Sequence, residues 1–216
     1  MSNFYFCFCH ILISKNVFDI FLNVPTKERI EKVKRVLSFR QPDLRIVLEE
    51  IRNTHNAHAV LRTCEAAGVL NVDIISTENF FPINEAISTR AEKWLNLNFY
   101  SSTPECLNKL KKQGFKIAVT YLNEGAIYYR DIDYTQPIAI VFGNESEGVS
   151  ETAVSLADWK IKIPMVGMVR SLNLSVSVGI ILYEAFHQRW IKGFYSKRRL
   201  SDDEFNKFYH KWLFPK

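Results

Sequence analysis

Short apolar segments of strand type alternate with segments of helical spacing along most of this chain of 216 residues. The strand-type segments are residues 45–51, 72–76, 115–120, 137–143 and 160–164. The segments of helical spacing are residues 55–69, 83–95, 103–114, 150–157 and 172–190. Consecutive parallel strands need a crossover, usually a helix, so this alternation predicts an α/β fold with a mostly parallel sheet flanked by helices.

The composition indicates one folded domain with appendages. Hydrophobic residues make up 47% of the chain and aromatic residues 13%, which excludes a disordered chain. The four cysteines, Cys7, Cys9, Cys64 and Cys106, form neither a disulfide framework nor a metal-ligand pattern. Cys7, Cys9 and His10 lack a second ligand pair, so we expect no metal. This cysteine usage favours a reducing cytoplasm.

Charge is distributed unevenly along the chain. The net charge is +5, but residues 26–45 hold seven Lys or Arg against three Asp or Glu, and residues 186–216 hold eight against three. The part between them is mildly acidic. Two basic ends on an acidic body suggest that the ends grip a polyanion, although solvated helix faces explain such a pattern equally well.

The first segments lie outside the alternating region. Residues 1–25 are apolar, but they lack a basic start and a cleavage site, and their apolar runs are shorter than the ~20 residues of a membrane-spanning helix. We therefore expect an extension of unknown role and no membrane association. A basic helix follows, with Thr26 as its N-cap, Ile30 and Val33 on one face, and its end before Pro42.

Most of the polar residues that could bind a ligand or act in catalysis fall in four loops that follow predicted strands. The loops are residues 50–56, 120–125, 142–148 and 163–173. In open α/β sheets, ligands bind beyond the carboxyl ends of the strands. The sequence therefore predicts one ligand site built from these loops.

The third of these loops is acidic and is bounded by Gly143 and Gly148. A loop that cradles phosphate would favour lysine over Glu145 and Glu147, so a P-loop is not expected. Ser150 is placed to cap the following helix. The loop is either a tight strand-to-helix turn or a surface that faces a cationic ligand or a sugar hydroxyl.

Two further groups of residues allow both a structural and a functional interpretation. Arg62 lies among apolar residues two turns after Asn56, where it forms either a structural ion pair or a contact to an anionic ligand. Ser171 or Asn173 can cap the long helix that follows. Capping needs only one of them, and their proximity to Arg170 suggests a ligand-binding loop as well.

Three motifs, residues 55–69, 140–150 and 163–185, together resemble the SPOUT class of RNA 2′-O-ribose methyltransferases. Within that class the chain is most similar to the bacterial tRNA (guanosine-2′-O-)-methyltransferases of the TrmH type, over about residues 26–195. The three motifs occur in order and at suitable separations, which makes the resemblance specific, whereas one of them alone would be weak.

The resemblance implies a SPOUT fold with a C-terminal deep trefoil knot at about residues 140–185, inside a methyltransferase domain of residues 46–190. It implies a homodimer whose active site borrows residues across the interface, and S-adenosylmethionine as methyl donor, without a metal. Residues 26–45 and the tail 191–216 would be flanking elements that bind tRNA.

The resemblance also assigns site residues. The residues that match cofactor-binding positions are Thr120, Leu122, Gly143, Ile163, Met168 and Leu172. Those that match catalytic and substrate positions are Asn56, Arg62, Glu145, Ser171 and Asn173. The RNA-binding candidates are Lys32, Lys34, Arg35, Arg40, Arg170, Arg189, Lys197, Arg198 and Arg199.

The expected reaction is methyl transfer to the ribose 2′-OH of guanosine 18 in the D-loop of tRNA. One alternative is the same chemistry on 23S rRNA or at another tRNA position, and a remote one is a non-catalytic RNA-binding protein. The family assigns the role of base to the residue that matches Arg62. A guanidinium is always charged, so it is a poor base. Either Arg62 orients the hydroxyl together with an RNA phosphate, or it has another role that the sequence leaves open.

Overall fold

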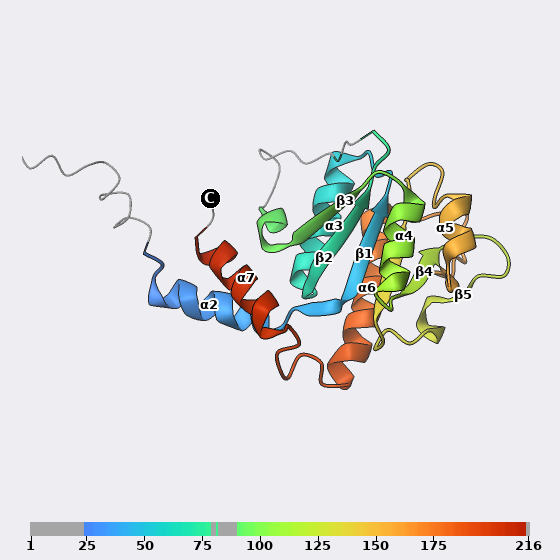
Figure 1. Cartoon of the computed structure of the whole chain (residues 1–216). Coiled ribbons are helices and arrows are strands. Elements are labelled where there is room, and N and C mark those ends of the chain that lie inside the picture. Colours follow the sequence, from blue (N-terminus) through green and yellow to red (C-terminus); the bar gives the residue numbers. More distant parts are fainter. Residues whose placement is uncertain (1–23, 79–80, 82–89, 215–216) are drawn as a thin grey trace, which may run out of the picture.

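A seven-stranded sheet forms the centre of the molecule in the computed structural model, which describes residues 24–78, 81 and 90–214 (Figure 1). The strands are β1 (Gln41–Glu49), β2 (Val69–Ile75), β3 (Asn96–Tyr100), β4 (Lys116–Thr120), β5 (Ile127–Tyr128), β6 (Ile138–Phe142) and β7 (Trp159–Lys162). Their order in the sheet is β3-β2-β1-β6-β4-β7-β5, and every neighbouring pair is parallel. The predicted α/β fold with a parallel sheet is confirmed.

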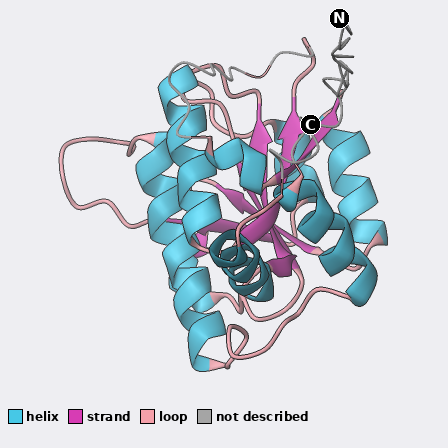
Figure 2. Ribbon diagram, turned by 90° about the vertical axis from the view of Figure 1, so that its left-hand side faces the viewer, coloured by secondary structure: helices cyan, strands magenta, loops and turns pink. Residues whose placement is uncertain are grey.

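Helices cover both faces of this sheet (Figure 2). On one face, α3 (Thr54–Ala66) and α6 (Leu174–Ile191) pack against the strands through residues such as Val60, Leu61, Val178 and Leu182, all buried. On the other face, α4 (Thr103–Lys112) and α5 (Glu151–Leu156) form a second, smaller core. This two-sided cover explains why the central strands are continuously apolar.

Two helices from the ends of the described chain pair beside the sheet (Figure 1). These are α2 (Lys27–Ser38) and α7 (Asp202–Leu213), which share a core that includes Val33, Leu37 and Trp212. Thr26 caps α2 as predicted, because its hydroxyl accepts a hydrogen bond from the Arg29 N–H. The C-terminal segment, predicted only as a basic tail, thus contains a helix that packs on the basic N-terminal helix.

Gly68 ends the turn after α3, as predicted, for a conformational reason. Its φ is +82°, and a Cβ atom there would lie 2.9 Å from the carbonyl oxygen of Phe39. Both observations favour glycine, which adopts positive φ without steric cost. The chain can therefore reverse tightly from α3 into β2.

Some boundaries differ from the prediction. β1 begins at Gln41, four residues earlier than predicted, because Pro42 at the start of the strand does not interrupt its pairing. β3 and β5 were not predicted. In the predicted helix 83–95, residues 83–89 lie outside the described residues, and Ala91–Trp94 form a 3₁₀ turn.

Two expectations about the whole chain stay predictions. Most of the predicted extension 1–25 lies outside the described residues, and the knot at about 140–185 stays a prediction. No helix in the described part of the chain combines the length and apolar character needed to cross a membrane.

Candidate active site

A pocket of about 660 Å³ opens at the carboxyl ends of β4, β6 and β7. Its walls come from the segments that follow these strands, at residues 120–123, 142–149 and 161–163, and from residues 170–174 at the start of α6. Three of the four loops selected from the sequence therefore line one pocket. The fourth contributes Asn56, which lies in the first turn of α3.

A chain of three side chains joins the three sequence motifs inside this pocket. The Asn173 Nδ2 donates to Asn56 Oδ1 at 3.0 Å, and the Asn56 Nδ2 donates to Glu145 Oε1 at 3.0 Å. The amide of Asn56 is thus held at both ends. Three residues that are far apart in sequence are joined by two hydrogen bonds, as a site that must orient a substrate requires.

Asn173, and not Ser171, is the N-cap of the long helix α6. Its Oδ1 accepts hydrogen bonds from the Ser175 N–H at 2.8 Å and from the Ser175 hydroxyl at 2.6 Å. Its amide nitrogen remains free to reach Asn56. One side chain therefore starts α6 and positions the site, whereas Ser171 is exposed on the wall of the pocket.

The acidic loop is closed by its two glycines and by Asn144. A Cβ atom on Gly143 would lie 2.1 Å from the backbone of Gly148, so only glycine allows the two segments to approach this closely. The Asn144 Nδ2 donates to the Glu50 carbonyl at 2.8 Å, and the Asn144 Oδ1 accepts from the Ser146 N–H at 2.8 Å. This rigid turn presents Glu145 to the pocket.

Glu49 anchors the end of the same loop at Ser150, and the sequence did not predict this role. The side chain is buried, and its carboxylate accepts from the Ser150 N–H at 2.9 Å, from the Ser150 hydroxyl at 2.7 Å and from the Thr103 hydroxyl. A buried carboxylate is stable only with such partners. The signal in the sequence was an acidic residue at the end of an otherwise apolar strand.

The residues predicted to bind the cofactor mostly line the pocket. Thr120, Leu122, Gly143, Ile163 and Leu172 do so. Met168 does not, because its side chain is fully exposed at 100%, and Met165 takes a place in the wall instead. The prediction for Met168 is thus not supported by its position in the single chain.

Arg62 lies apart from the pocket of its own chain. It is exposed on α3 and does not belong to the pocket lining, whereas Asn56 does. Six residues along an α-helix rotate the side chain by about 120° and advance it by about 9 Å, which accounts for the separation. Among the described residues the structure shows no ion pair for Arg62, so the structural alternative has no support.

Two of the predicted RNA-binding arginines are buried, and these predictions are wrong for a physical reason. Arg40 is 1% exposed. Its guanidinium donates to Glu65 Oε1 at 2.7 Å and to the Val69 carbonyl at 3.2 Å, and it lies over the ring of Trp212. Burial lowers the pKa of Arg40, and Glu65 opposes that effect. The side chain thus joins α3 to α7 and is not available to RNA.

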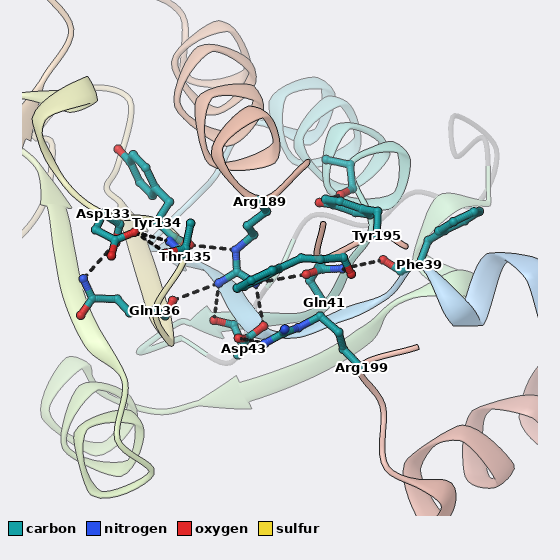
Figure 3. Close-up of polar contacts among 12 residues, drawn as sticks. Phe39, Gln41, Asp43, Asp133, Tyr134, Thr135, Gln136, Arg189, Tyr195 and Arg199 are labelled. Carbon is teal, nitrogen blue, oxygen red and sulfur yellow. Dashed lines mark hydrogen bonds and ion pairs between the residues drawn. The ribbon is translucent and has the colours of Figure 1, made fainter. Parts of the chain in front are cut away.

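Arg189 is completely buried at the centre of a polar network (Figure 3). It donates to Asp43 Oδ1 at 2.6 Å, to Gln41 Oε1 at 3.2 Å and to the carbonyls of Tyr134 and Gln136 at 2.8 and 3.0 Å. Burial lowers its pKa, which the carboxylate of Asp43 opposes. Arg189 fastens the end of α6 to the start of β1.

The other basic candidates are nearer the surface. Arg199 is partly buried, where it donates to Asp43 Oδ2 at 2.6 Å and stacks on Phe194. Arg170 is exposed at the pocket wall. The remaining candidates are exposed on α2 or just before α7: Lys32, Lys34, Arg35, Lys197 and Arg198.

The described cysteines are buried, and the described residues include no metal cluster. Cys64 and Cys106 are buried, and burial raises the pKa of both thiols. Thiols with raised pKa values are poor nucleophiles. No group of three His, Cys, Asp or Glu within the described ranges could hold a metal ion, and Cys7, Cys9 and His10 lie outside those ranges.

Comparison with known proteins gives one consistent result. Residues 43–183 match the model of the SpoU rRNA Methylase family. The chain is 42% identical to the tRNA (guanosine(18)-2′-O)-methyltransferase of Thermus thermophilus over 188 residues, 87% of this chain and 97% of the relative. The enzyme of the same name from Escherichia coli is 36% identical over 77% of this chain and 73% of the relative.

A solved structure agrees with these sequence matches. The A. aeolicus TrmH/SpoU tRNA modifying enzyme superposes with a TM-score of 0.82 at 41% identity. The match covers 87% of this chain and 95% of that one. The likeness therefore extends beyond the sheet to the helices that flank it.

Proposed function

Because the chain belongs to the SpoU rRNA methylase family, we propose that it is an enzyme that methylates the ribose 2′-OH of guanosine 18 in the D-loop of tRNA. The observation that carries the proposal is the Asn173–Asn56–Glu145 chain, which brings the three motifs together in one pocket. The relatives that share 36–42% identity with this chain are named for this reaction. Methyl transfer to RNA is thus the activity that the site supports best.

Transfer RNA, rather than ribosomal RNA, is the substrate that the flanking helices favour. The family model itself covers residues 43–183, whereas the likeness to the Thermus tRNA enzyme covers 97% of that relative. The region outside the family model includes α2 and all of α7, and the exposed basic candidates lie on α2 and just before α7. Exposed basic residues on α2 and before α7 suit the phosphate backbone of a compact RNA.

The pocket fits S-adenosylmethionine as methyl donor. Leu122, Ile163 and Leu172 offer apolar surface for an adenine ring, and the strand ends offer backbone donors and acceptors. The lining also holds Glu145 and Glu147, whose charge suits a cationic donor. When bound, this cofactor supplies an electrophilic methyl group.

The residues of the chain act by orientation. Asn56, fixed between Asn173 and Glu145, offers a rigid amide toward the ribose, and the exposed Ser171 and Arg170 lie on the same wall. Holding two reactants in line accounts for most of the acceleration that such a transfer needs. The proton of the 2′-OH leaves to an RNA phosphate oxygen or to water.

Arg62 completes this site from a second copy of the chain. In its own subunit it lies on another side of α3 from Asn56, so a homodimer is the arrangement that brings it to a pocket. Apolar side chains stand exposed along α6, among them Val176, Tyr183, Trp190 and Ile191, at 47–68% exposure. Burying such a surface favours an isologous contact between two copies.

The direct test is to map methylated riboses. Incubating the protein with unmodified tRNA transcripts and S-adenosylmethionine is expected to give one 2′-O-methyl group, at guanosine 18. A transcript with 2′-deoxyguanosine at this position is the matched control, because it lacks the reacting hydroxyl. Methylation only of ribosomal RNA, or at another tRNA nucleotide, would contradict the proposal.

The exposed basic residues of α2 provide a second test. Replacing Lys32, Lys34 and Arg35 by alanine is expected to weaken tRNA binding and to flatten the salt dependence of its affinity, since each lost phosphate contact reduces the slope by about one. The affinity for S-adenosylmethionine should stay unchanged. Binding measured between about 50 and 200 mM salt checks this, and an unaltered slope would place the RNA on another surface.

A further inference from the structure

A second pocket, of about 380 Å³, lies on the α4 face of the sheet, where β1, β2 and β3 meet α4 and the first turn of α7. Its floor includes Asn71 and Asn96, near the amino ends of β2 and β3. The pocket of the candidate active site opens at the carboxyl ends of other strands. The two pockets are therefore separate, and nothing in the reaction above uses the second.

A ladder of side chains crosses the floor of this second pocket. The Asn96 Nδ2 donates to Asn71 Oδ1 at 2.8 Å and to Asn98 Oδ1 at 3.2 Å, and the Asn98 Nδ2 donates to Asp73 Oδ1 at 3.1 Å. Asp73 is fully buried and accepts two hydrogen bonds from Arg45, both at 2.7 Å. The amides are thus held in fixed orientations before any ligand arrives.

Such a ladder is unusual on a parallel sheet. Parallel strands are normally apolar on both faces, and Asn and Asp are depleted in strands. Side chains two residues apart share a face, which brings Asn71 and Asp73 of β2 beside Asn96 and Asn98 of β3. A solvated strand face needs neither a buried aspartate nor connected amides. The pattern therefore indicates a recognition surface.

The chemistry of the pocket suits a neutral, planar, polar group. The charges of Arg45 and Asp73 compensate each other, and Lys109 and Glu204 carry opposite charges at the wall. A phosphate would favour a net positive lining. Side-chain amides both donate and accept, as the edges of nucleobases do, and the half-buried ring of Phe115 offers an apolar wall.

We propose that this pocket receives one unstacked nucleobase of the RNA substrate, at a position away from the methylated nucleotide. The proposal rests on the proposed function, which supplies the RNA. Glu204 belongs to the first turn of α7, and Arg198 pairs with Asp202 in the same turn. The exposed Lys197 and Arg198 lie just before this turn, so RNA held there and on α2 would pass the mouth of the pocket.

Alanine substitutions at the floor test this inference. Asn71→Ala and Asn96→Ala are each expected to raise the Kd for tRNA about tenfold, on the scale of one lost base contact. The salt slope of the affinity should not change, because no phosphate contact is lost. The turnover rate at saturating tRNA should also stay at the wild-type value. Asn108→Ala, on an exposed position of α4 outside the pocket, is the matched control and should bind as wild type.

A crosslinking experiment does not depend on the stability of these variants. Gln113 lines the pocket and is exposed, so a photoreactive p-benzoylphenylalanine at this position should crosslink to one nucleotide of bound tRNA. The same group at Asn108 should not crosslink to that nucleotide. The modified nucleotide can be mapped by reverse transcription.

The results separate this inference from the proposed function. If the wild-type protein does not methylate tRNA, the proposed function is wrong. The crosslinking experiment still shows whether RNA enters the pocket. Wild-type tRNA affinity in both alanine variants, a flattened salt slope, or no crosslink from position 113 would each overturn the base pocket. Titration with the four nucleoside monophosphates tests whether the pocket binds a free nucleotide in place of an RNA base. Binding of one of them that Asn96→Ala abolishes would overturn the assignment to RNA.

Discussion

Arg62→Lys is expected to lower the rate of single-turnover methyl transfer by at least about a hundredfold, on the scale of losing one well-placed catalytic contact. Lysine keeps the charge but loses the planar fork that can hold a phosphate while it reaches a hydroxyl. Because Arg62 is proposed to contact the RNA and not the cofactor, the affinity for S-adenosylmethionine should stay nearly unchanged. Calorimetry and rapid-quench methylation on the same sample measure both quantities.

Mixed dimers show whether Arg62 acts across the interface. Arg62→Lys and Asn173→Ala should each inactivate their homodimers. In a purified heterodimer of the two, one site receives wild-type Arg62 from one subunit and wild-type Asn173 from the other, so about half of the wild-type activity should return. An Arg62 that serves its own subunit would leave both sites of the heterodimer defective, and no activity would return.

A purely structural Arg62 predicts a different pattern. The variant would then methylate tRNA at the wild-type rate, and its melting temperature would fall. Arg62 is exposed and shows no ion pair among the described residues, which makes such a loss of stability unexpected. Wild-type turnover of Arg62→Lys would nevertheless remove the catalytic assignment.

The sequence predicted those parts of the molecule that depend on local pattern. The five predicted strands pair in one parallel sheet, and the helix caps at Thr26 and Ser150 form as expected. β3 was missed because Asn96 and Asn98 give it a polar face, whereas buried parallel strands are apolar. The two asparagines face the second pocket, whereas Leu97 on the other side of the strand packs against the core.

The candidate site was predictable in position but not in its supporting contacts. The loops after strands are local features, and they do meet at one pocket. The hydrogen bonds of Glu49 to Ser150 and Thr103 join segments 101 and 54 residues apart, and no periodicity indicates them. Burial of Arg40 and Arg189 is hidden for the same reason, since their carboxylate partners Glu65 and Asp43 lie 25 and 146 residues away in sequence.

Arg189→Leu is expected to lower the free energy of unfolding by roughly 3–5 kcal/mol, the range for removing one partner of a buried ion pair. Leucine leaves the carbonyls of Tyr134 and Gln136 and the side chain of Gln41 without their donor. Asp43 keeps Arg199 as a partner, which limits the loss. Urea unfolding followed by circular dichroism measures the change.

Lys192→Leu is the matched control, because Lys192 is an exposed basic residue at the C-cap of the same helix. It should unfold like the wild type. The two arginine roles then give opposite results. If Arg189 is structural, the Arg189→Leu protein is less stable than the wild type. Its salt slope of tRNA binding, measured at temperatures where it stays folded, is unchanged, since no phosphate contact existed. If Arg189 binds RNA, the Arg189→Leu protein keeps the wild-type stability and its salt slope is flatter. That outcome would mean that the buried network of Figure 3 opens when RNA binds.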